Sequence, residues 1–536
     1  MQHAPSRPAS VEKIAGILVP LFSVRTARSF GIGDIGDLPE LARWSLDHGH
    51  RLLQLLPLGD LPEGENSPYS AATSFAIDSM YVAIDQLEDV TDEERHALVG
   101  PDADNTIARI KSAPNVEYST VRAIKRRILR AAFERFFVDH WERGSARANA
   151  MSAFMNEQHG WLEGYALFRA LKSRYAENWW RGWPAGIRDR EPAVLERVAH
   201  ELSRETLLHS YIQWIAHEQW AAARKAVNAM GVQLMGDLPF MVGVDSADVW
   251  SGRKDFFVDA TLGVPGDAMA PEGQDWGLPS YDWDAMDKDD LAWVRRRSQQ
   301  MGRLFDRFRV DHLVGYYRMY VRPRATSEEP AGAPFWMPAE ELAQRARGEK
   351  VLETIVSSAK SVGARVIAED LGTIPPFVRA SLERLAVPGY RVMMWERDND
   401  VFRDPATYPY VSLATSGTHD TVTMAAWWES MPFADRQHAL HEIPALRSVA
   451  KAPDVDKLTP KVHDALLHAL YGAGSELTLL PIQDLWGSHD RINVPGVVGS
   501  QNWSWRIPMT LDELRKDPQL APRMRIAGEI ARSHGR

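Results

Sequence analysis

The most regular feature of the chain is a series of short apolar runs, most of them separated by helical patterns of hydrophobic positions. Short apolar runs bounded by polar or turn residues are typical of strands buried on both faces. Their alternation with helices predicts a parallel α/β sheet, and eight of them favour a closed (β/α)8 TIM barrel. An open, doubly wound sheet is the alternative, because periodicity does not separate the two. The runs are residues 17–21, 52–56, 232–236, 308–310, 365–368, 391–395, 411–415 and 476–480.

The spacing of the runs is uneven. About 175 residues separate the second run from the third, far more than one connecting helix requires. Amphipathic helical patterns cover residues 122–137, 161–175 and 208–227. We therefore expect a mostly helical inserted subdomain at residues 85–205.

A second insertion is expected at residues 242–289, which are rich in Gly, Pro, Trp and Asp and show little periodicity. Long irregular loops in a compact domain are usually functional, so we interpret this segment as a substrate loop. Beyond residue 507 the pattern is charged and weakly helical, and it predicts no C-terminal β-sandwich. We expect residues 1–536 to form a single catalytic barrel that carries both insertions.

Acidic residues stand at or just beyond the ends of three predicted strands. They are Asp311, Glu369 and Asp420. The carboxyl ends of the strands carry the chemistry of a parallel barrel, so these acids are expected to converge. Arg309 lies two residues before Asp311, and residues two apart on a strand share a face. The arginine should orient the carboxylate, as a glycosidase nucleophile requires, whereas a buried Arg–Asp pair that only braces the fold is the alternative.

The composition narrows the class of protein. Hydrophobic residues make up 45% and charged residues 25% of the 536 positions, an ordinary balance for a soluble globular protein. The formal net charge of −10 argues against nucleic acid or an anionic membrane as a partner. The 19 Trp and 14 Tyr favour a carbohydrate ligand, because flat rings stack on sugar faces.

The chain has no cysteine, which excludes disulfides and thiolate metal sites and fits a reducing compartment. No apolar run approaches the length of a membrane span. Residues 14–22 are not followed by the small-residue cleavage site of a signal peptide. We therefore expect a cytoplasmic protein.

The sequence does not support three common functional motifs. Residues 31–36 match G-x-G-x-x-G, but the polar segment 23–29 separates them from the preceding strand, so a glycine-lined loop before a helix is favoured over a dinucleotide site. His419 and Asp420 have no second His or Cys at ligand spacing, so no metal is expected and His419 is interpreted as a hydrogen-bond donor to a sugar hydroxyl. No G-x-S-x-G sequence is present, which argues against a serine hydrolase.

Two further residues follow predicted strands. Tyr69 lies in the loop after the second strand, where it is either a platform for a sugar or a core ring. Asp237 follows the third strand and would share a rim with Asp311, although a turn or cap acid is the alternative.

Taken together and in order, these residues and motifs resemble the 4-α-glucanotransferases of glycoside hydrolase family 77, also called amylomaltases or disproportionating enzymes. The resemblance covers nearly the whole chain. The matching segments are residues 31–36, 56–59, 67–69, 161–163, 165–168, 236–239, 245–250, 263–265, 273–277, 309–312, 368–372, 387–389, 418–420 and 502–506.

The resemblance implies a barrel with inserted subdomains and no metal or other cofactor. It makes Asp311 the nucleophile, Glu369 the general acid and base, and Asp420 the stabiliser of the transition state. Positions that contact the glucan in the family correspond to Tyr69, Asp237, Asp267, Arg309, His419 and Asn493, and Trp276 and His312, which lie in matching segments, complete the expected substrate-binding set.

The expected reaction is the retaining transfer of an α-1,4-glucan segment from a maltooligosaccharide donor to the 4-hydroxyl of an acceptor glucan or glucose. The expected partners are maltooligosaccharides and longer α-1,4-glucans such as amylose or glycogen. Two alternatives stay open: an α-1,4-glucan hydrolase that uses the same acids, and a non-catalytic glucan-binding protein on a degenerate barrel.

The chain departs from the family pattern at several positions. Ala268 and Met269 stand where members commonly have Tyr and Phe, Leu278 stands where they have Asn, and Thr421 with Val422 replaces Asn and Asp. Loss of an aromatic pair predicts weaker binding of long glucans, a preference for short donors and more hydrolysis. The alternative is that Trp276 fills the gap.

Overall fold

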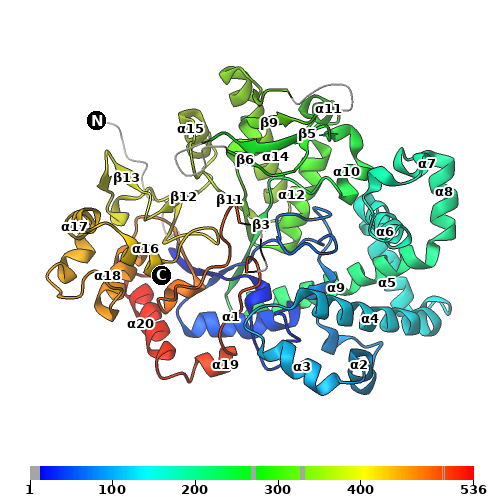
Figure 1. The fold of residues 1–536 in the computed structure, drawn as a ribbon, viewed down its shortest axis with the longest axis horizontal. Helices are drawn as coiled ribbons and strands as arrows, with labels where there is room; N and C mark the ends of the chain where they lie inside the picture. The colour runs from blue at the N-terminus through cyan, green and yellow to red at the C-terminus, as the bar shows by residue number, and fades with distance from the viewer. Residues whose placement is uncertain (1–11, 267–272, 326–331, 498, 500) are drawn as a thin grey trace.

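The computed structural model describes residues 12–266, 273–325, 332–497, 499 and 501–536. Its centre is a closed barrel of parallel strands in the order β1-β16-β15-β12-β11-β8-β3-β2 (Figure 1). The predicted (β/α)8 barrel is therefore confirmed, and the open sheet is excluded. The barrel strands are β1 (Ile14–Leu18), β2 (Leu52–Gln54), β3 (Gln233–Leu238), β8 (Arg307–Val310), β11 (Arg365–Ala368), β12 (Gly389–Val392), β15 (Ser412–Thr415) and β16 (Leu477–Pro481).

Each predicted apolar run overlaps one barrel strand, but three strands begin before the predicted position: β8 by one residue, β12 by two and β1 by three. Strand β1 begins at Ile14 because its first residues pair with β16, and the chain turns into a 3-10 helix at Leu21. Strand β12 begins at Gly389, which pattern analysis treats as a strand breaker. A side chain at Gly389 would meet the Asp370 carboxylate at 2.7 Å, so this position requires the smallest residue.

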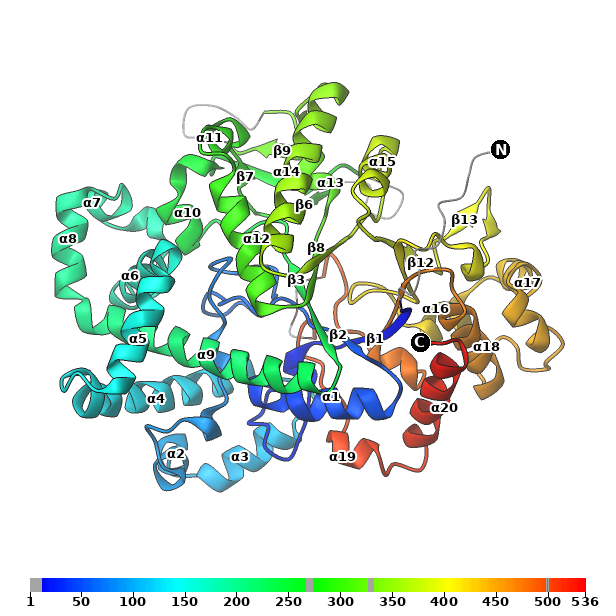
Figure 2. The ribbon, with the colours of Figure 1, turned by 180° about the vertical axis from the view of Figure 1, so that it is seen from behind.

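Helices between β2 and β3 account for the long gap in the apolar pattern. The three predicted helical patterns correspond to α4 (Tyr118–Phe136), α6 (His159–Arg174) and α9 (Ser203–Ala229). Figures 1 and 2 show α4 to α8 together on one side of the barrel and α16 to α18 with α20 on the other. The remaining helices of this region are α2 (Asp92–Val99), α3 (Ala103–Ser112), α5 (Ala146–Glu157), α7 (Ala185–Arg188) and α8 (Pro192–Glu201).

Residues 242–289, expected to be irregular, contain short regular elements where they are described. Strand β5 (Ala260–Val264) joins a four-stranded antiparallel sheet of order β10-β9-β5-β6. Its neighbour β9 lies after β8, as does β10, which pairs with β9, so no local alternation could reveal the pairing. The division into one catalytic domain with two insertions stays a prediction. The elements are α10 (Ala247–Ser251), β4 (Phe256–Phe257), β6 (Gln274–Asp275), β7 (Ser280–Tyr281), α11 (Trp283–Lys288), β9 (Met319–Pro323) and β10 (Phe335–Met337).

Helices complete the layer around the barrel. After β16 the described residues form a short 3-10 helix, two α-helices and no further strand, so the predicted absence of a β-sandwich in this part of the chain is confirmed. None of the helices within the described residues is both long and apolar enough to cross a membrane. The outer helices are α1 (Leu38–Asp47), α12 (Ala292–Leu304), α13 (Val314–Tyr317), α14 (Glu341–Ser361), α15 (Pro376–Arg384), α16 (Met424–Ser430), α17 (Phe433–Glu442), α18 (Pro460–Tyr471), α19 (Leu511–Leu514) and α20 (Leu520–Ser533), with the hairpin β13 (Arg397–Asp398) and β14 (Val401–Phe402).

The backbone conformation and close packing of the loop after β1 explain its glycines. Gly31 has φ +76°, a left-handed conformation that favours glycine. A side chain at Gly33 would meet the Leu21 carbonyl oxygen at 2.1 Å. The favoured interpretation, a structural loop that leads into a helix, agrees with this geometry.

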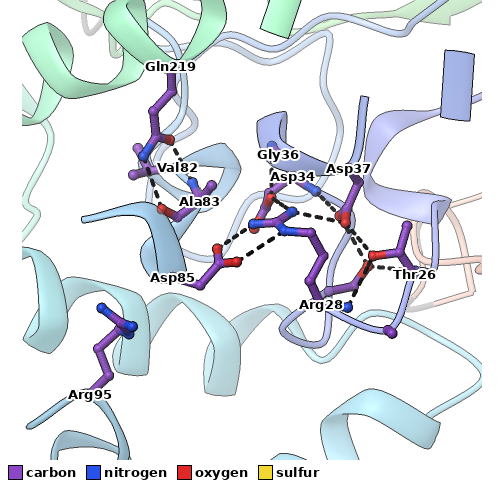
Figure 3. A network of polar contacts seen from close by, with 12 residues as sticks. Thr26, Arg28, Asp34, Gly36, Asp37, Val82, Ala83, Asp85, Arg95 and Gln219 are labelled. Atoms are coloured by element: carbon purple, nitrogen blue, oxygen red, sulfur yellow. Dashed lines mark hydrogen bonds and ion pairs between the residues drawn. The ribbon is translucent and has the colours of Figure 1, made fainter. Parts of the chain in front are cut away.

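A buried ionic network fastens this loop to the helical region (Figure 3). Arg28 donates from Nη1 to Asp34 at 2.8 Å and to Asp37 at 2.9 Å, and its Nε donates to Asp85 at 3.1 Å. From α4, Lys125 donates to Asp34 Oδ2 at 3.1 Å, and its side chain is only 1% exposed. The network therefore joins the rim of the barrel to α4 through the buried Lys125–Asp34 pair, whereas Arg28 and Asp85 lie nearer the surface.

Replacing Lys125 with methionine should destabilise the fold by about 3 kcal/mol, because it removes one of the two cations that compensate the buried Asp34 and leaves the Met80 and Val82 carbonyls without their donor. Urea unfolding followed by circular dichroism measures the change. The control is Arg126→Met, whose ion pair with Glu63 is about half exposed on both sides and should cost less than about 1 kcal/mol. Equal unfolding midpoints for the two variants would contradict the structural role of Lys125.

Candidate active site

One buried guanidinium connects the acids at the carboxyl end of the barrel. Arg309 Nη1 lies 2.8 Å from Asp237 Oδ1 and 2.9 Å from Asp311 Oδ1, while Nη2 lies 3.7 Å from Glu369 Oε2. The strand register produces this cluster: Asp237 pairs with Arg309 across β3 and β8, and Glu369 directly follows β11. The Arg309 side chain is 5% exposed, so these charges act on one another with little screening by water.

Asp237 lies behind the active-site surface. Both of its oxygens accept hydrogen bonds from Arg309 at 2.8 Å, and Oδ2 also accepts one from the Tyr69 hydroxyl at 2.8 Å. The residue is 1% exposed. Its carboxylate is therefore positioned to hold Arg309 and Tyr69, and its predicted contact with the glucan stays a prediction.

Glu369 is held so that it retains a proton at neutral pH. Its Oε2 accepts a hydrogen bond from the backbone N–H of His312 at 2.6 Å. Burial raises the pKa of Glu369 to about 8, with Asp311 adding to the rise and Arg309 opposing it. A carboxylic acid that is mostly protonated at pH 7 can donate a proton to a leaving group.

Asp420, in contrast, is held in its charged, deprotonated form. Its Oδ1 accepts a hydrogen bond from Asn493 Nδ2 at 2.7 Å, and His419 Nε2 lies 3.3 Å from Oδ2. Burial alone would raise the pKa of Asp420, but His419, Asn493 and Arg309 together bring it well below its usual range. The site thus combines an acid that keeps its proton with an acid that keeps its charge.

The turn that carries Asp420 is braced by one of the departures from the family pattern. Thr421 Oγ1 accepts from the backbone N–H of Thr418 at 3.0 Å and donates to its carbonyl at 3.1 Å. Arg491 donates to the Asp420 carbonyl at 2.7 Å. Thr421 therefore supports the position of Asp420 without an amide side chain.

A cavity of about 400 Å³ opens above the acids and has aromatic walls. The rings of Tyr69 and His419 are stacked with centroids 5.1 Å apart, and Trp503 lies 5.7 Å from each. On another wall, the rings of Trp276 and His312 are perpendicular, with their centroids 4.9 Å apart. Burial lowers the pKa of His312 to about 4, so this ring is neutral at pH 7. Such a hollow suits a sugar, which offers apolar faces to rings and hydroxyls to acids.

Most predicted site residues meet at this cavity. Its lining includes Asp311, Glu369, Asp420, Tyr69, Trp276, Arg309, His312, His419 and Asn493. Asp267, Ala268 and Met269 lie outside the described residues, so the hypothesis about the missing aromatic pair stays a prediction. Leu278 lies in the wall and makes it more apolar than the usual Asn would.

The sequence interpretation missed several wall residues. Trp503 is the most prominent, and its segment, residues 502–506, had been singled out for its resemblance alone. Trp503 lies more than 20 residues after the end of β16. It reaches the cavity from a turn, in which its own φ is +61°. Gln274 also lines the cavity and lies in the matching segment 273–277, whereas the wall residues Phe240 and Met241 have no local sequence signal.

Within the part of the chain that the structure describes, no group of three or more His, Cys, Asp or Glu residues could hold a metal ion. The acids of the cavity are instead committed to Arg309, Asn493 and backbone donors.

Comparisons with known proteins agree with this geometry. A profile of glycoside hydrolase family 77, described as 4-alpha-glucanotransferase, matches residues 19–511. The chain belongs to this family. It is 30% identical over 526 residues to the 4-alpha-glucanotransferase of Chlamydia pneumoniae, covering 96% of this chain and 95% of the relative. It is 31% identical over 493 residues to that of Thermus thermophilus, covering 89% and 92%.

A solved structure shares the fold. The amylomaltase from Streptococcus agalactiae in complex with acarbose aligns with a TM-score of 0.81 and 24% identity, over 98% of this chain and 100% of that chain. The family resemblance drawn from the motifs is therefore confirmed, and the chain is a 4-alpha-glucanotransferase.

Replacing Trp503 with alanine should lower kcat/KM for maltotriose about tenfold, because it frees the stacked rings of Tyr69 and His419, and a tenfold change corresponds to about 1.4 kcal/mol. Initial rates of glucose formation measure the effect. The matched control is Trp179→Ala, since Trp179 is 38% exposed and outside the cavity, and its rates should not change. Unchanged rates for Trp503→Ala would remove this ring from the substrate site.

Proposed function

We propose that this enzyme transfers α-1,4-glucan segments with retention of configuration, with Asp311 as nucleophile and Glu369 as general acid and base. One observation carries the proposal: a single guanidinium, Arg309, contacts both carboxyl groups, yet the two groups have different surroundings. Asp311 forms an ion pair with Arg309 at one oxygen, at 2.9 Å, and accepts a hydrogen bond from the Phe240 N–H at the other, at 3.2 Å. Glu369 is enclosed and keeps its proton.

In the first half of the reaction, Asp311 attacks the anomeric carbon and forms an ester with the donor segment. Glu369 gives its proton to the departing glycosidic oxygen. In the second half, Glu369 takes the proton of an incoming sugar 4-hydroxyl, which displaces Asp311. Each half inverts the anomeric carbon, so the product has the configuration of the donor. For this chemistry the two carboxyl groups should lie roughly 5–5.5 Å apart in a glucan complex.

Asp420 forms no covalent bond and transfers no proton in this reaction. Positive charge develops on the sugar ring in the oxocarbenium-like transition state. A carboxylate whose pKa lies well below its usual range stays charged and stabilises that state. Asn493 and His419 fix its orientation, so no reorganisation is needed as the charge develops.

The proposed substrates are maltooligosaccharides, with amylose and glycogen as longer donors. The named activity of the relatives and the acarbose bound by the Streptococcus amylomaltase support an α-glucan in the cavity. The apolar wall of Trp276, Leu278 and Trp503 favours a sugar acceptor over water, which supports transfer over hydrolysis. The absence of cysteine supports a cytoplasmic location.

Asp311→Ala should lower kcat by about 10⁴ or more, because no other carboxylate can form the ester. In Glu369→Gln, an α-glucosyl fluoride should leave an ester on Asp311, since fluoride departs without a proton and the second half lacks its base. Peptide mass spectrometry locates the adduct. Glu383→Gln, an exposed change on α15, is the control and should leave the rates unaltered. An adduct on a residue other than Asp311 would refute the assignment.

The pH profile should have an alkaline limb near pH 8. Glu369 is active when protonated, so kcat/KM should fall about tenfold per pH unit above its pKa of about 8. Asp237→Asn should move the limb to lower pH, because the Asp237 charge raises the pKa of Glu369 and partly neutralises Arg309, which lowers it. Stopped assays with maltotriose between pH 6 and about 9.5 measure both profiles. A limb that does not move in Asp237→Asn would contradict this coupling.

A further inference from the structure

The end of the barrel opposite the active site has three cationic side chains around one hollow. Arg307 begins β8, Arg365 begins β11, and Lys360 lies in the last turn of α14. The hollow has a volume of about 350 Å³. Every residue of its lining is described, and none of them is acidic. A concave surface with one sign of charge concentrates ions of the opposite sign.

The barrel register forces the two arginines together. Arg307 pairs with Arg365 across the parallel strands β8 and β11, so both side chains leave the sheet on the same side. Arg307 is only 5% exposed, and burial followed by the charge of Arg365 lowers the pKa of Arg307. Two like charges are thus held side by side, one of them nearly buried, which costs free energy unless an anion compensates them.

The acids near the three cations compensate only part of their positive charge. Arg307 Nε donates to Gln233 at 2.8 Å, but across the described chain no ion pair involves Arg307, Arg365 or Lys360. The adjacent Asp306 is committed elsewhere, since its oxygens accept from Arg224 at 2.7 Å and from the backbone N–H of Leu234 at 2.8 Å. Glu476 and Asp306 both raise the pKa of Arg307, yet they are two carboxylates against three cations, and Asp306 is already paired with Arg224.

Helix termini do not account for the cluster either. The helices α14 and α15 end beside the hollow, and cations near helix carboxyl ends often serve the helix dipole. Here the terminal carbonyls are already satisfied by backbone donors. Ala359 O accepts from the N–H groups of Val362 and Ala364, and Leu382 O accepts from that of Val387.

We propose that this hollow binds the phosphate group of a small phosphate monoester the size of a sugar phosphate. The fork of a guanidinium matches phosphate oxygens in pairs, and Lys360 adds a third positive charge. A water molecule occupies about 30 Å³, so the hollow has room for a body beyond the phosphate. The apolar side chains of Val356, Val366 and Leu385 form the wall on which that body packs.

Isothermal titration calorimetry with glucose 6-phosphate and with inorganic phosphate, at constant ionic strength, tests the site on the intact enzyme. We expect one saturable site with Kd on the order of 1 mM or tighter for glucose 6-phosphate, and weaker binding of inorganic phosphate. Arg365→Gln and Lys360→Gln should each weaken binding about tenfold or more. Both side chains are exposed, so the variants should fold and keep their activity on maltotriose.

The matched control is Lys516→Gln, which removes one exposed positive charge after α19 and should leave Kd unchanged. The proposal is overturned if no binding is seen, or if the hollow variants bind like the control. Competition between glucose 6-phosphate and maltotriose would place the anion in the active site and also reject it. Equal binding of citrate would show a general anion hollow instead of a phosphate site.

Discussion

The active site depends on a buried cation that cannot give up its charge. Arginine stays protonated even when enclosed, so Arg309 must be surrounded by acids. Asp237, Asp311 and Glu369 provide more negative charge than one guanidinium balances. Burial resolves the excess by raising the pKa of Glu369 to about 8. The proton that the reaction needs is therefore a consequence of packing three acids around one arginine.

The same packing explains why the acids differ from one another. Asp420 stands at the end of β15, where His419 and Asn493 contact its two oxygens and compensate its burial. Among the described residues, Glu369 has one backbone donor, at 2.6 Å, and its nearest ion-pair partner is Arg309 at 3.7 Å. Two carboxyl groups in one cavity thus reach opposite protonation states through their contacts, which is how one site can hold both a proton donor and a fixed negative charge.

Sequence patterns predicted the parts of the structure that are local. Apolar runs located the barrel strands, and the acids at their ends lay close together as expected, because a parallel barrel brings its strand ends to one rim. Patterns could not show that Asp237 would turn inward to Arg309 and Tyr69, since that depends on the register of β3 against β8. Trp503 was missed as a wall residue because its neighbours in the fold, Tyr69 and His419, are distant in the chain.

Strand β8 shows how one alternating pattern serves both ends of the barrel. Arginine and apolar residues alternate along β8. Phe308 and Val310 share one face, and Arg307 and Arg309 share the opposite face. Around Arg309 the barrel places three carboxyl groups, whereas around Arg307 it places a second arginine and a hollow. Since the same strand holds both cations under similar burial, the lack of compensation at the amino end is not a property of the strand. The lack of compensation arises from the residues around Arg307. An anion from solution would supply the negative charge that the three carboxyl groups supply around Arg309.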